Sequence, residues 1–401
     1  MKEKKPIELG LSRNLAQFSI LVIVNGFVGG MIGLERSVLP SMAEEEFSVV
    51  SKTALLSFII VFGVAKAITN YFTGVLADRW GRKRLLVAGW LVALPVPVII
   101  YYANSWDWIV ISNILLGVNQ GLTWSSTVVM KIDLVGPRQR GLAMGINESV
   151  GYVAVGSMAY LTGASAMQYG YRDTLFFVGI VLALIGLALS YFLVKDTHQH
   201  VQKEQEDSGH AILESVFKET TYKNPNLGSI TQAGLVNNLN DGMVWGILPV
   251  LLIQLEFDLK EIGKLVAVYP LVWGFFQVIT GKLSDHLNKK NMLVFGMLLQ
   301  GVALTGYWQG ESFNEFFIYS VLLGLGTAIV YPTFLSAISD YVSPGQRAAS
   351  IGVFRLWRDL GYAIGALLSG IIADLYGVEF AVLSIALVTF LSALIIQLRM
   401  A

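Results

Sequence analysis

The chain has 401 residues, of which 54% are hydrophobic and 14% are charged, and its mean hydropathy is +0.61. A water-soluble domain this apolar could not cover its surface with polar groups, so the composition predicts a protein that uses lipid as part of its solvent. The formal net charge is zero and cysteine is absent, which gives no bulk attraction to nucleic acid and excludes disulfides, thiolate metal sites and a cysteine nucleophile.

Twelve stretches of the chain are long and apolar enough to cross a bilayer as helices, which takes about 20 residues. They are residues 14–40, 53–77, 85–103, 107–131, 140–165, 173–195, 228–254, 260–284, 290–308, 313–339, 346–373 and 378–398. The first stretch follows a basic leader, but it is too long for the apolar part of a signal peptide and no small-residue cleavage site follows it. We interpret it as an uncleaved first helix.

The basic residues predict the orientation of the chain. Of the 28 Lys and Arg residues, twenty lie in the leader, in loops or at span ends on the N-terminal side, five lie on the other side, and three lie inside spans. Positive charge stays with the cytoplasm. We therefore expect a multi-pass protein of the plasma membrane (or inner membrane) with both termini in the cytoplasm.

The longest hydrophilic stretch, residues 196–226, separates six spans from six. We interpret it as a cytoplasmic linker that is partly helical around residues 211–218. The predicted domains are an N-terminal six-helix half (1–195), the linker (196–227) and a C-terminal six-helix half (228–401).

The two halves repeat each other at a fixed offset. Residues 74–78 read GVLAD and residues 281–285 read GKLSD, while residues 133–140 read DLVGPRQR and residues 340–347 read DYVSPGQR. The offset is 207 positions in both cases, because 281 − 74 and 340 − 133 are each 207. Two motifs that share one offset indicate a tandem duplication, and parallel repeats about an axis along the membrane normal are a known transporter architecture.

The loop after the second span carries a family resemblance. Residues 74–86, GVLADRWGRKRLL, resemble the signature loop of the major facilitator superfamily at every defining position, and the second half keeps a degraded copy. The resemblance covers nearly the whole chain and implies an all-α membrane protein with 12 transmembrane helices in two pseudo-symmetric six-helix halves. It also implies a transporter, but carriers of sugars, drugs, ions and organic acids share this loop, so it does not identify the cargo.

The resemblance implies that this loop helps to close the cytoplasmic side of the protein. Asp78 is placed where it could cap the start of the eleventh span, and the basic cluster can pair with Asp133 at the end of the fourth. The alternative is that the basic residues only anchor the topology. The candidate gating residues are Gly74, Asp78, Arg79, Gly81, Arg82, Lys83, Arg84, Asp133, Asp285 and Asp340.

The chain departs from its superfamily in two places. Many proton-coupled members carry an arginine in the fourth span, three residues before a Gln-Gly pair, but here that pair is Gln120-Gly121 and the position holds Gly117. Drug antiporters usually carry a Gly-Pro element in the fifth span, and this fifth span has no proline. Both differences weaken the resemblance to multidrug exporters and to their proton relay.

Charged residues inside the spans point to function, because a charge near the bilayer centre costs about 2.5–3.5 kcal/mol on insertion scales. They are Lys66 in the second span, Glu148 in the fifth, Asp241 in the seventh, and Arg355 and Arg358 in the eleventh. The resembled fold lines the boundary between its halves with spans two, five, eight and eleven, so all of these except Asp241 should border a central cavity. Glu35 and Arg36, toward the outer end of the first span, carry less weight because they can snorkel.

These charges could instead neutralise one another without touching a substrate. Arg355 and Asp359 are spaced i, i+4 and could pair within one helix. Glu148 could pair with Lys66 or with an arginine.

Candidate roles follow from the chemistry of the side chains. Burial penalises the charged form of a carboxyl group, so Glu148 and Asp241 are the candidates for proton coupling. Basic and polar groups could hold an anionic group such as a carboxylate or phosphate. The substrate-binding candidates are Lys66, Asn70, Arg355, Arg358, Asn237, Gln120, Trp124, Tyr269, Trp273 and Gln277. The aromatic candidates recur at helical spacing, so a role in helix packing is as good an explanation for them as a role in substrate binding.

The motif search argues against catalysis. The chain has no GxxxxGK[ST] loop, HExxH, GxSxG or dinucleotide fingerprint, and no span contains histidine or cysteine. His198 and His200 are interpreted as solvated, so we expect no metal site. We also expect that the protein uses no cofactor and is not an enzyme.

The leading hypothesis is a monomeric secondary transporter that works by alternating access and couples to protons. Its cargo would be a polar small molecule, anionic if the buried basic residues bind it. The other partner of the protein is the lipid bilayer, and we expect no binding to nucleic acid. The alternatives are efflux of amphipathic drugs or lipids by the same fold and, from another class, a transporter-like membrane sensor.

Overall fold

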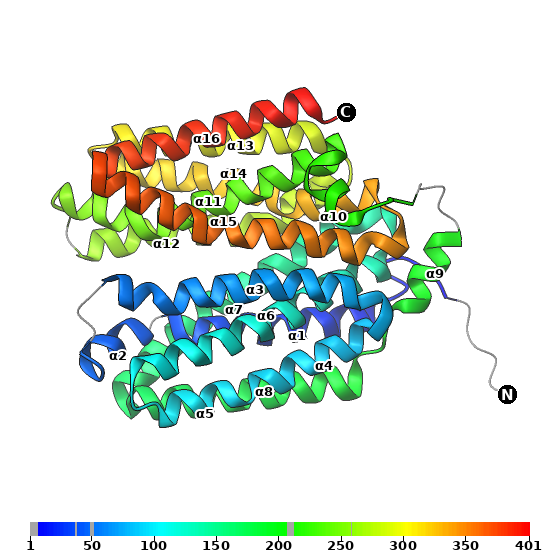
Figure 1. Ribbon diagram of the computed structural model, residues 1–401, viewed down its shortest axis with the longest axis horizontal. Coiled ribbons are helices and arrows are strands. Elements are labelled where there is room, and N and C mark those ends of the chain that lie inside the picture. The colour runs from blue at the N-terminus through cyan, green and yellow to red at the C-terminus, as the bar shows by residue number, and fades with distance from the viewer. Residues whose placement is uncertain (1–6, 37, 49–51, 207–211, 258) are drawn as a thin grey trace.

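The computed structural model describes residues 7–36, 38–48, 52–206, 212–257 and 259–401. Within these ranges it is built from helices and turns, without strands. The elements up to residue 193 gather in one bundle and those from residue 225 onward gather in a second bundle beside it (Figure 1).

The first bundle contains six long helical segments. They are α1 (Leu15–Arg36), α3 (Lys52–Trp80), α4 (Arg82–Ala93) continuing as α5 (Pro95–Tyr102), α6 (Trp106–Val135), α7 (Arg140–Tyr169), and α8 (Tyr171–Ala188) continuing as the π-helical turn η2 (Leu189–Leu193). A short helix, α2 (Leu39–Glu45), lies between α1 and α3, and the 3₁₀ turn η1 (Pro137–Gln139) joins α6 to α7.

The second bundle repeats this pattern. Its long helices are α11 (Pro225–Gln254), α12 (Leu259–Ser284), α13 (Lys289–Gln309), α14 (Phe313–Tyr341), α15 (Arg347–Tyr376) and α16 (Val378–Arg399). The 3₁₀ turn η4 (Pro344–Gln346) joins α14 to α15 and lies 207 positions after η1. The twelve long segments of the described residues, in two six-helix halves, confirm the predicted fold class.

Between the halves, the linker forms α9 (His198–Glu206), then α10 (Val216–Lys218), which runs into the π-helical turn η3 (Glu219–Lys223). The helix predicted around residues 211–218 therefore starts later and ends later than expected. Residue 211 itself lies outside the described residues.

Seven helical segments of the described chain are long and apolar enough to cross a membrane by length and composition alone. The others include α6, α7 and α11, which carry polar side chains into the interior, among them Asn147 and Asp241. Large apolar side chains such as Phe72, Leu271 and Leu367 are more than half exposed. On helices of this length, such side chains form a surface suited to lipid.

The halves touch along two helix pairs, α3 with α15 and α7 with α12. At the end of the molecule that carries the signature loop, a Cβ added to Gly74 would overlap the carbonyl oxygen of Ala348 and lie 2.8 Å from Cα of Gly352. Further along the same helices, a Cβ added to Gly63 or Gly370 would meet no atom within 4 Å in the described chain. Glycine thus permits backbone contact at one end, and the helices separate toward the other.

Candidate functional site

A network of buried charges joins the two halves at the centre of the bundle pair. Arg355 is 0% exposed and Glu148 1%, and Arg358 and Asp359 are similarly buried, while Lys66 is partly exposed. The predicted candidates on α3, α7 and α15 are therefore brought together.

Glu148 is the centre of the N-terminal part of this network. Its Oε1 lies 3.6 Å from Nη2 of Arg355 on the other half. The same oxygen accepts hydrogen bonds from Nδ2 of Asn147 at 2.7 Å and from Nε1 of Trp124 at 3.2 Å. Of the pairings left open by the sequence, Glu148 thus takes an arginine and not Lys66.

Arg355 continues the network across the boundary between the halves. Its Nη1 donates to Oγ of Ser125 at 3.1 Å, and Ser125 donates to Oδ1 of Asn70 at 2.5 Å. Asn70 in turn donates to Oδ2 of Asp359 at 2.5 Å. Among the described residues, Nε and Nη2 of Arg355 find no hydrogen-bond partner, although Nη2 faces Glu148, so the guanidinium keeps donors that a ligand could use.

The predicted pair of Arg355 with Asp359 is wrong. Asp359 is held by Arg358, whose Nη2 and Nε lie 2.7 and 2.9 Å from Oδ1. The reason is that Arg355 reaches Glu148 and Ser125 of the other half. Arg358 therefore neutralises Asp359, the next residue in the chain.

Two lysines border this network. Nζ of Lys66 lies 5.5 Å from the ring of Trp124 and 5.8 Å from the ring of Phe62, within range of cation–π attraction. Lys131, which is 0% exposed, donates a hydrogen bond to Oδ1 of Asn147.

Sequence reasoning missed Lys131, because the fourth span was ended at that residue and its charge was assigned to a cytoplasmic loop. The helix α6 continues to Val135 instead. A signal was available: Lys131 lies seven residues after Trp124, on the same helix face.

Aromatic side chains from both halves pack beside the charges. The rings of Tyr152 and Trp273 are 4.1 Å apart, and the hydroxyl groups of Tyr152 and Tyr331 are 2.9 Å apart. Trp273 and Gln277 are buried, and their side-chain polar atoms make no hydrogen bond. These two predicted candidates therefore also lie where the halves meet, with polar atoms available to a ligand.

Asp241 and Asn237 on α11 form their hydrogen bonds within the C-terminal half. Asp241 accepts a hydrogen bond from Tyr269, whose hydroxyl also lies 3.3 Å from Oγ1 of Thr327. Asn237 accepts from Nε2 of Gln300 on α13 at 3.0 Å. The ring of Tyr269 stacks on Trp273 with centroids 5.8 Å apart, so Asp241 is connected through Tyr269 to the aromatic cluster, whereas Asn237 faces α13.

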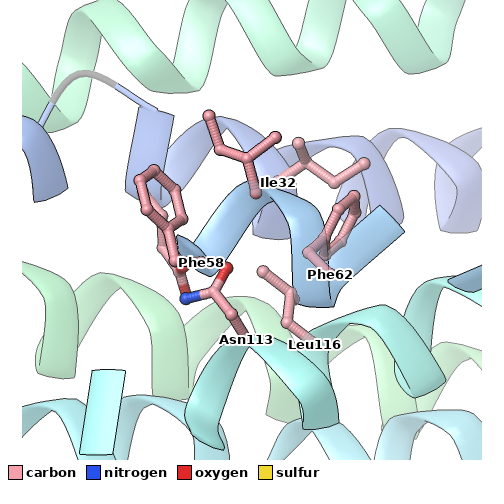
Figure 2. A pocket seen from close by; sticks show the side chains of 7 residues that line it. Ile32, Phe58, Phe62, Asn113 and Leu116 are labelled. Atoms are coloured by element: carbon pink, nitrogen blue, oxygen red, sulfur yellow. The ribbon is translucent and has the colours of Figure 1, made fainter. Parts of the chain in front are cut away.

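Gln120 likewise faces the interior of its own half. It donates to the carbonyl oxygen of Val28 at 2.9 Å and so ties α6 to α1. Nearby, a small pocket between α1, α3 and α6 is lined by Ile32, Phe58, Phe62, Asn113, Leu116 and others (Figure 2). Glu35 belongs to this pocket and is only 2% exposed, so the expectation that it snorkels is wrong. It faces α3 and α6 inside the bundle.

The signature loop closes one end of the molecule by charge pairing. Arg82 is buried and binds Asp78 at 2.5 Å and Asp133 at 3.5 Å. Arg347 of the other half lies 3.4 Å from the same Asp133. The predicted contact of the basic cluster with Asp133 is therefore present, through Arg82. Arg79 and Arg84 are exposed, which agrees with the alternative that these basic residues only anchor the topology.

The prediction that Asp78 caps the start of the eleventh span is wrong. Its counterpart in the second half, Asp285, caps a helix instead. Asp285 accepts hydrogen bonds from the backbone N–H groups of Gly141 at 2.6 Å and Leu142 at 2.9 Å, at the start of α7. The forked guanidinium of Arg82 reaches both Asp78 and Asp133. Lys289, which holds the equivalent place, binds Asp340 with its single ammonium group and leaves Asp285 free to cap a helix.

The linker helix α9 adds a second layer to this closed end. Glu204 is 6% exposed and binds both Arg140 and Arg347. These two arginines are equivalent residues of the two halves, 207 positions apart. Thr197, just before α9, donates to Asp133 at 2.8 Å. The linker therefore ties the two halves together through a single buried carboxylate.

Replacing Glu204 by glutamine is expected to destabilise the protein by about 1–3 kcal/mol, because two buried guanidinium groups lose a charged acceptor. Thermal unfolding in detergent would show a lower midpoint. Glu214→Gln is the matched control, since Glu214 is exposed and its replacement should leave the midpoint unchanged. Equal midpoints for both variants would contradict a structural role for Glu204.

Comparisons with known proteins agree with this architecture. The family described as Major Facilitator Superfamily matches residues 18–228 and 230–400. A solved structure of the human organic anion transporter MFSD10 (TETRAN) is similar with a TM-score of 0.79 and 16% sequence identity, over 96% of this chain and 99% of that one.

Curated relatives are more similar in sequence than this structure and cover 61–87% of the chain. A multidrug resistance protein MdtG from Salmonella typhimurium is 26% identical over 363 residues, which is 87% of this chain and 86% of that protein. An uncharacterized MFS-type transporter from Methanocaldococcus jannaschii is 21% identical over 79% of this chain and 81% of its own length. A probable 4-methylmuconolactone transporter from Cupriavidus pinatubonensis is 26% identical over 61% of this chain and 57% of its own length.

Proposed function

The chain belongs to the major facilitator superfamily, and from this premise we propose that it is a proton-coupled secondary transporter that carries an anionic small molecule by alternating access. Its family and its transporter-named relatives indicate a membrane-embedded transporter of small molecules and not an enzyme. Beyond this, we propose which ion is coupled to transport, what charge the cargo carries and which residues are involved.

The observation that carries the anionic cargo is the excess of basic groups where the halves meet. Arg355 and Arg358 are paired with Glu148 and Asp359, whereas Lys66 and Lys131 form no ion pair with a carboxylate in the described chain. A buried positive charge without a counter-ion is costly, and proteins retain such groups mainly at functional sites. The structural neighbour described as an organic anion transporter supports the same choice.

Alternating access would proceed by rocking of the two predicted halves, residues 1–195 and 228–401, about the site between them, with the monomer as the working unit. If the termini are cytoplasmic, the end closed by Gly74, Asp133 and Glu204 faces the cytoplasm. This structure would then be the state in which the site is closed to the cytoplasm. The linker, residues 196–227, would have to release Arg140 or Arg347 before that end opens.

Efflux of amphipathic drugs is the second candidate. The observation that favours it is the aromatic cluster of Tyr152, Trp273 and Tyr331 beside the charges, which offers apolar contact area. Relatives named as multidrug resistance proteins agree with it. A thermal-shift screen of organic acids, sugar phosphates and drugs separates the two, because a bound ligand stabilises the folded protein. Stabilisation by drugs alone would overturn the anionic proposal.

For proton coupling we assign the proton to Asp241, which is buried and accepts from Tyr269. In liposomes, an imposed proton gradient should drive accumulation of the cargo, and an uncoupler should abolish it. Asp241→Asn should keep downhill exchange of the cargo and lose accumulation, because an amide cannot bind and release the proton. Asp374→Asn, at an exposed position, should behave like the unaltered protein. Accumulation that persists with the uncoupler would remove the proton from the proposal.

A further inference from the structure

The two lysines of the central network lack an acidic partner. Lys131 is fully buried and its hydrogen bond goes to the neutral side chain of Asn147. Lys66 contacts the faces of Trp124 and Phe62. In the described part of the chain, neither ammonium group forms an ion pair with a carboxylate. Ionisable groups in helices that cross a bilayer are rare and mark substrate or ion pathways, so lysines held only by a neutral amide or by aromatic faces point to a ligand.

Lys131 is nevertheless connected to the pair that crosses the boundary. It binds Oδ1 of Asn147, and Nδ2 of the same amide binds Glu148 at 2.7 Å. Glu148 faces Arg355 at 3.6 Å. One neutral amide therefore separates the ammonium group of Lys131 from the Glu148–Arg355 pair.

The basic groups are also spread along the helices. Lys66 lies against Trp124, and the backbone of Lys131 lies seven residues beyond Trp124, about 10 Å further along α6. Arg355 binds Ser125, next to Trp124, and retains two buried donors without a hydrogen bond. The side chain of Lys131 nevertheless reaches Asn147, and Asn147 and Trp124 donate to the same Oε1 of Glu148. The site thus offers neighbouring positive groups, with Lys66 and Arg355 near Trp124 and Lys131 at Asn147.

The count of charges matches this geometry. Arg355 is paired with Glu148 and Arg358 with Asp359, which leaves Lys66 and Lys131 without an ion-paired carboxylate among the described residues of the network. A cargo with one negative charge would supply a counter-ion for one of these lysines. A cargo with two negative charges would supply one for each.

We propose that the cargo is a small dicarboxylate, with one carboxylate bound by Arg355 and the other by Lys131. This inference rests on the proposed function and narrows its substrate class. The first carboxylate binds the donors of Arg355 that make no hydrogen bond, Nε and Nη2, where the guanidinium offers a planar, two-pronged set. Its charge compensates Lys66 near Trp124 while Glu148 stays in place. The second replaces the amide of Asn147 as the partner of Lys131. Lys131 is then a specificity-determining residue that distinguishes diacids from monoacids.

The test compares straight-chain dicarboxylates of four to eight carbons with their monomethyl esters, which keep the shape and lose one charge. Binding to the purified full-length protein is measured by calorimetry and by thermal stabilisation. At least one diacid should bind 10-fold or more tightly than its own monoester. Lys131→Gln should reduce that ratio to about one by weakening diacid binding, with little change for the monoester. Lys131→Arg should retain a preference for the diacid.

The matched control is Lys195→Gln, because Lys195 is exposed and outside the site; its diacid preference should equal that of the unaltered protein. Equal affinity of the unaltered protein for diacid and monoester would overturn the proposal of a dicarboxylate cargo. This result does not depend on whether the Lys131 variants insert into the membrane. A Lys131→Gln variant that weakens both ligands equally would remove the assigned role of Lys131. Binding of no anion at all, with binding of amphipathic drugs, would instead reject the anionic proposal on which this inference rests.

Discussion

Replacing Arg355 by alanine is expected to reduce transport at least about 30-fold, with normal insertion into the membrane. Arg355 is 0% exposed, faces Glu148 of the other half and donates to Ser125. Removing one partner of a buried, hydrogen-bonded charge pair costs about 2–5 kcal/mol. Here the variant would lose the group that binds the cargo and would leave Glu148 buried without a counter-ion. Initial rates of uptake into proteoliposomes measure the effect.

The controls separate binding from folding. Arg399→Ala removes the same side chain at an exposed helix end and should leave transport unchanged. Arg355→Lys keeps the positive charge but loses the planar fork, so we expect partial activity. Lys66→Ala should also abolish transport if the half-buried ammonium contributes to the site. Full activity of both Arg355→Ala and Lys66→Ala would make these charges structural.

Replacing Gly74 by alanine is expected to abolish transport by preventing closure of the end that carries the signature loop. A methyl group at this position would overlap the carbonyl oxygen of Ala348 and crowd Gly352 on α15. Because these neighbours are backbone atoms of a packed helix, the two halves must move apart to make room. The protein would then lack one of the two states that alternating access requires.

The matched control is Gly63→Ala, on the same helix, where the added methyl group meets no atom within 4 Å in the described chain. It should transport normally. Because the chain contains no cysteine, a single pair of spin labels at Arg138 and Leu287 can report the distance between the halves at the closed end. This distance should increase in Gly74→Ala and stay constant in Gly63→Ala. An unchanged distance with lost transport would place the defect elsewhere.

Hydropathy and repeats were enough to predict the fold class of this chain. The bilayer requires about 20 mostly apolar residues for each span, and the twelve stretches predicted on this basis correspond to the twelve long helical segments of the described chain. The offset of 207 between equivalent motifs reappears in the structure as the matching turns η1 and η4. The resemblance carried by residues 74–86 is confirmed by a family match over nearly the whole chain. These features are local, and local sequence specifies them.

The partners of the buried charges depended on the three-dimensional structure alone. Sequence spacing suggested Arg355 with Asp359 and a cap by Asp78, but the structure pairs Arg355 with Glu148 and assigns the cap to Asp285. Lys131 was assigned to a loop, although α6 carries it into the interior. The contacts of Arg355 with Glu148 and of Asp285 with Gly141 join helices that are far apart in the sequence. Which groups meet depends on how far each helix extends, how it is rotated and how closely glycine lets the halves approach, and the pattern of hydrophobic residues does not encode these quantities.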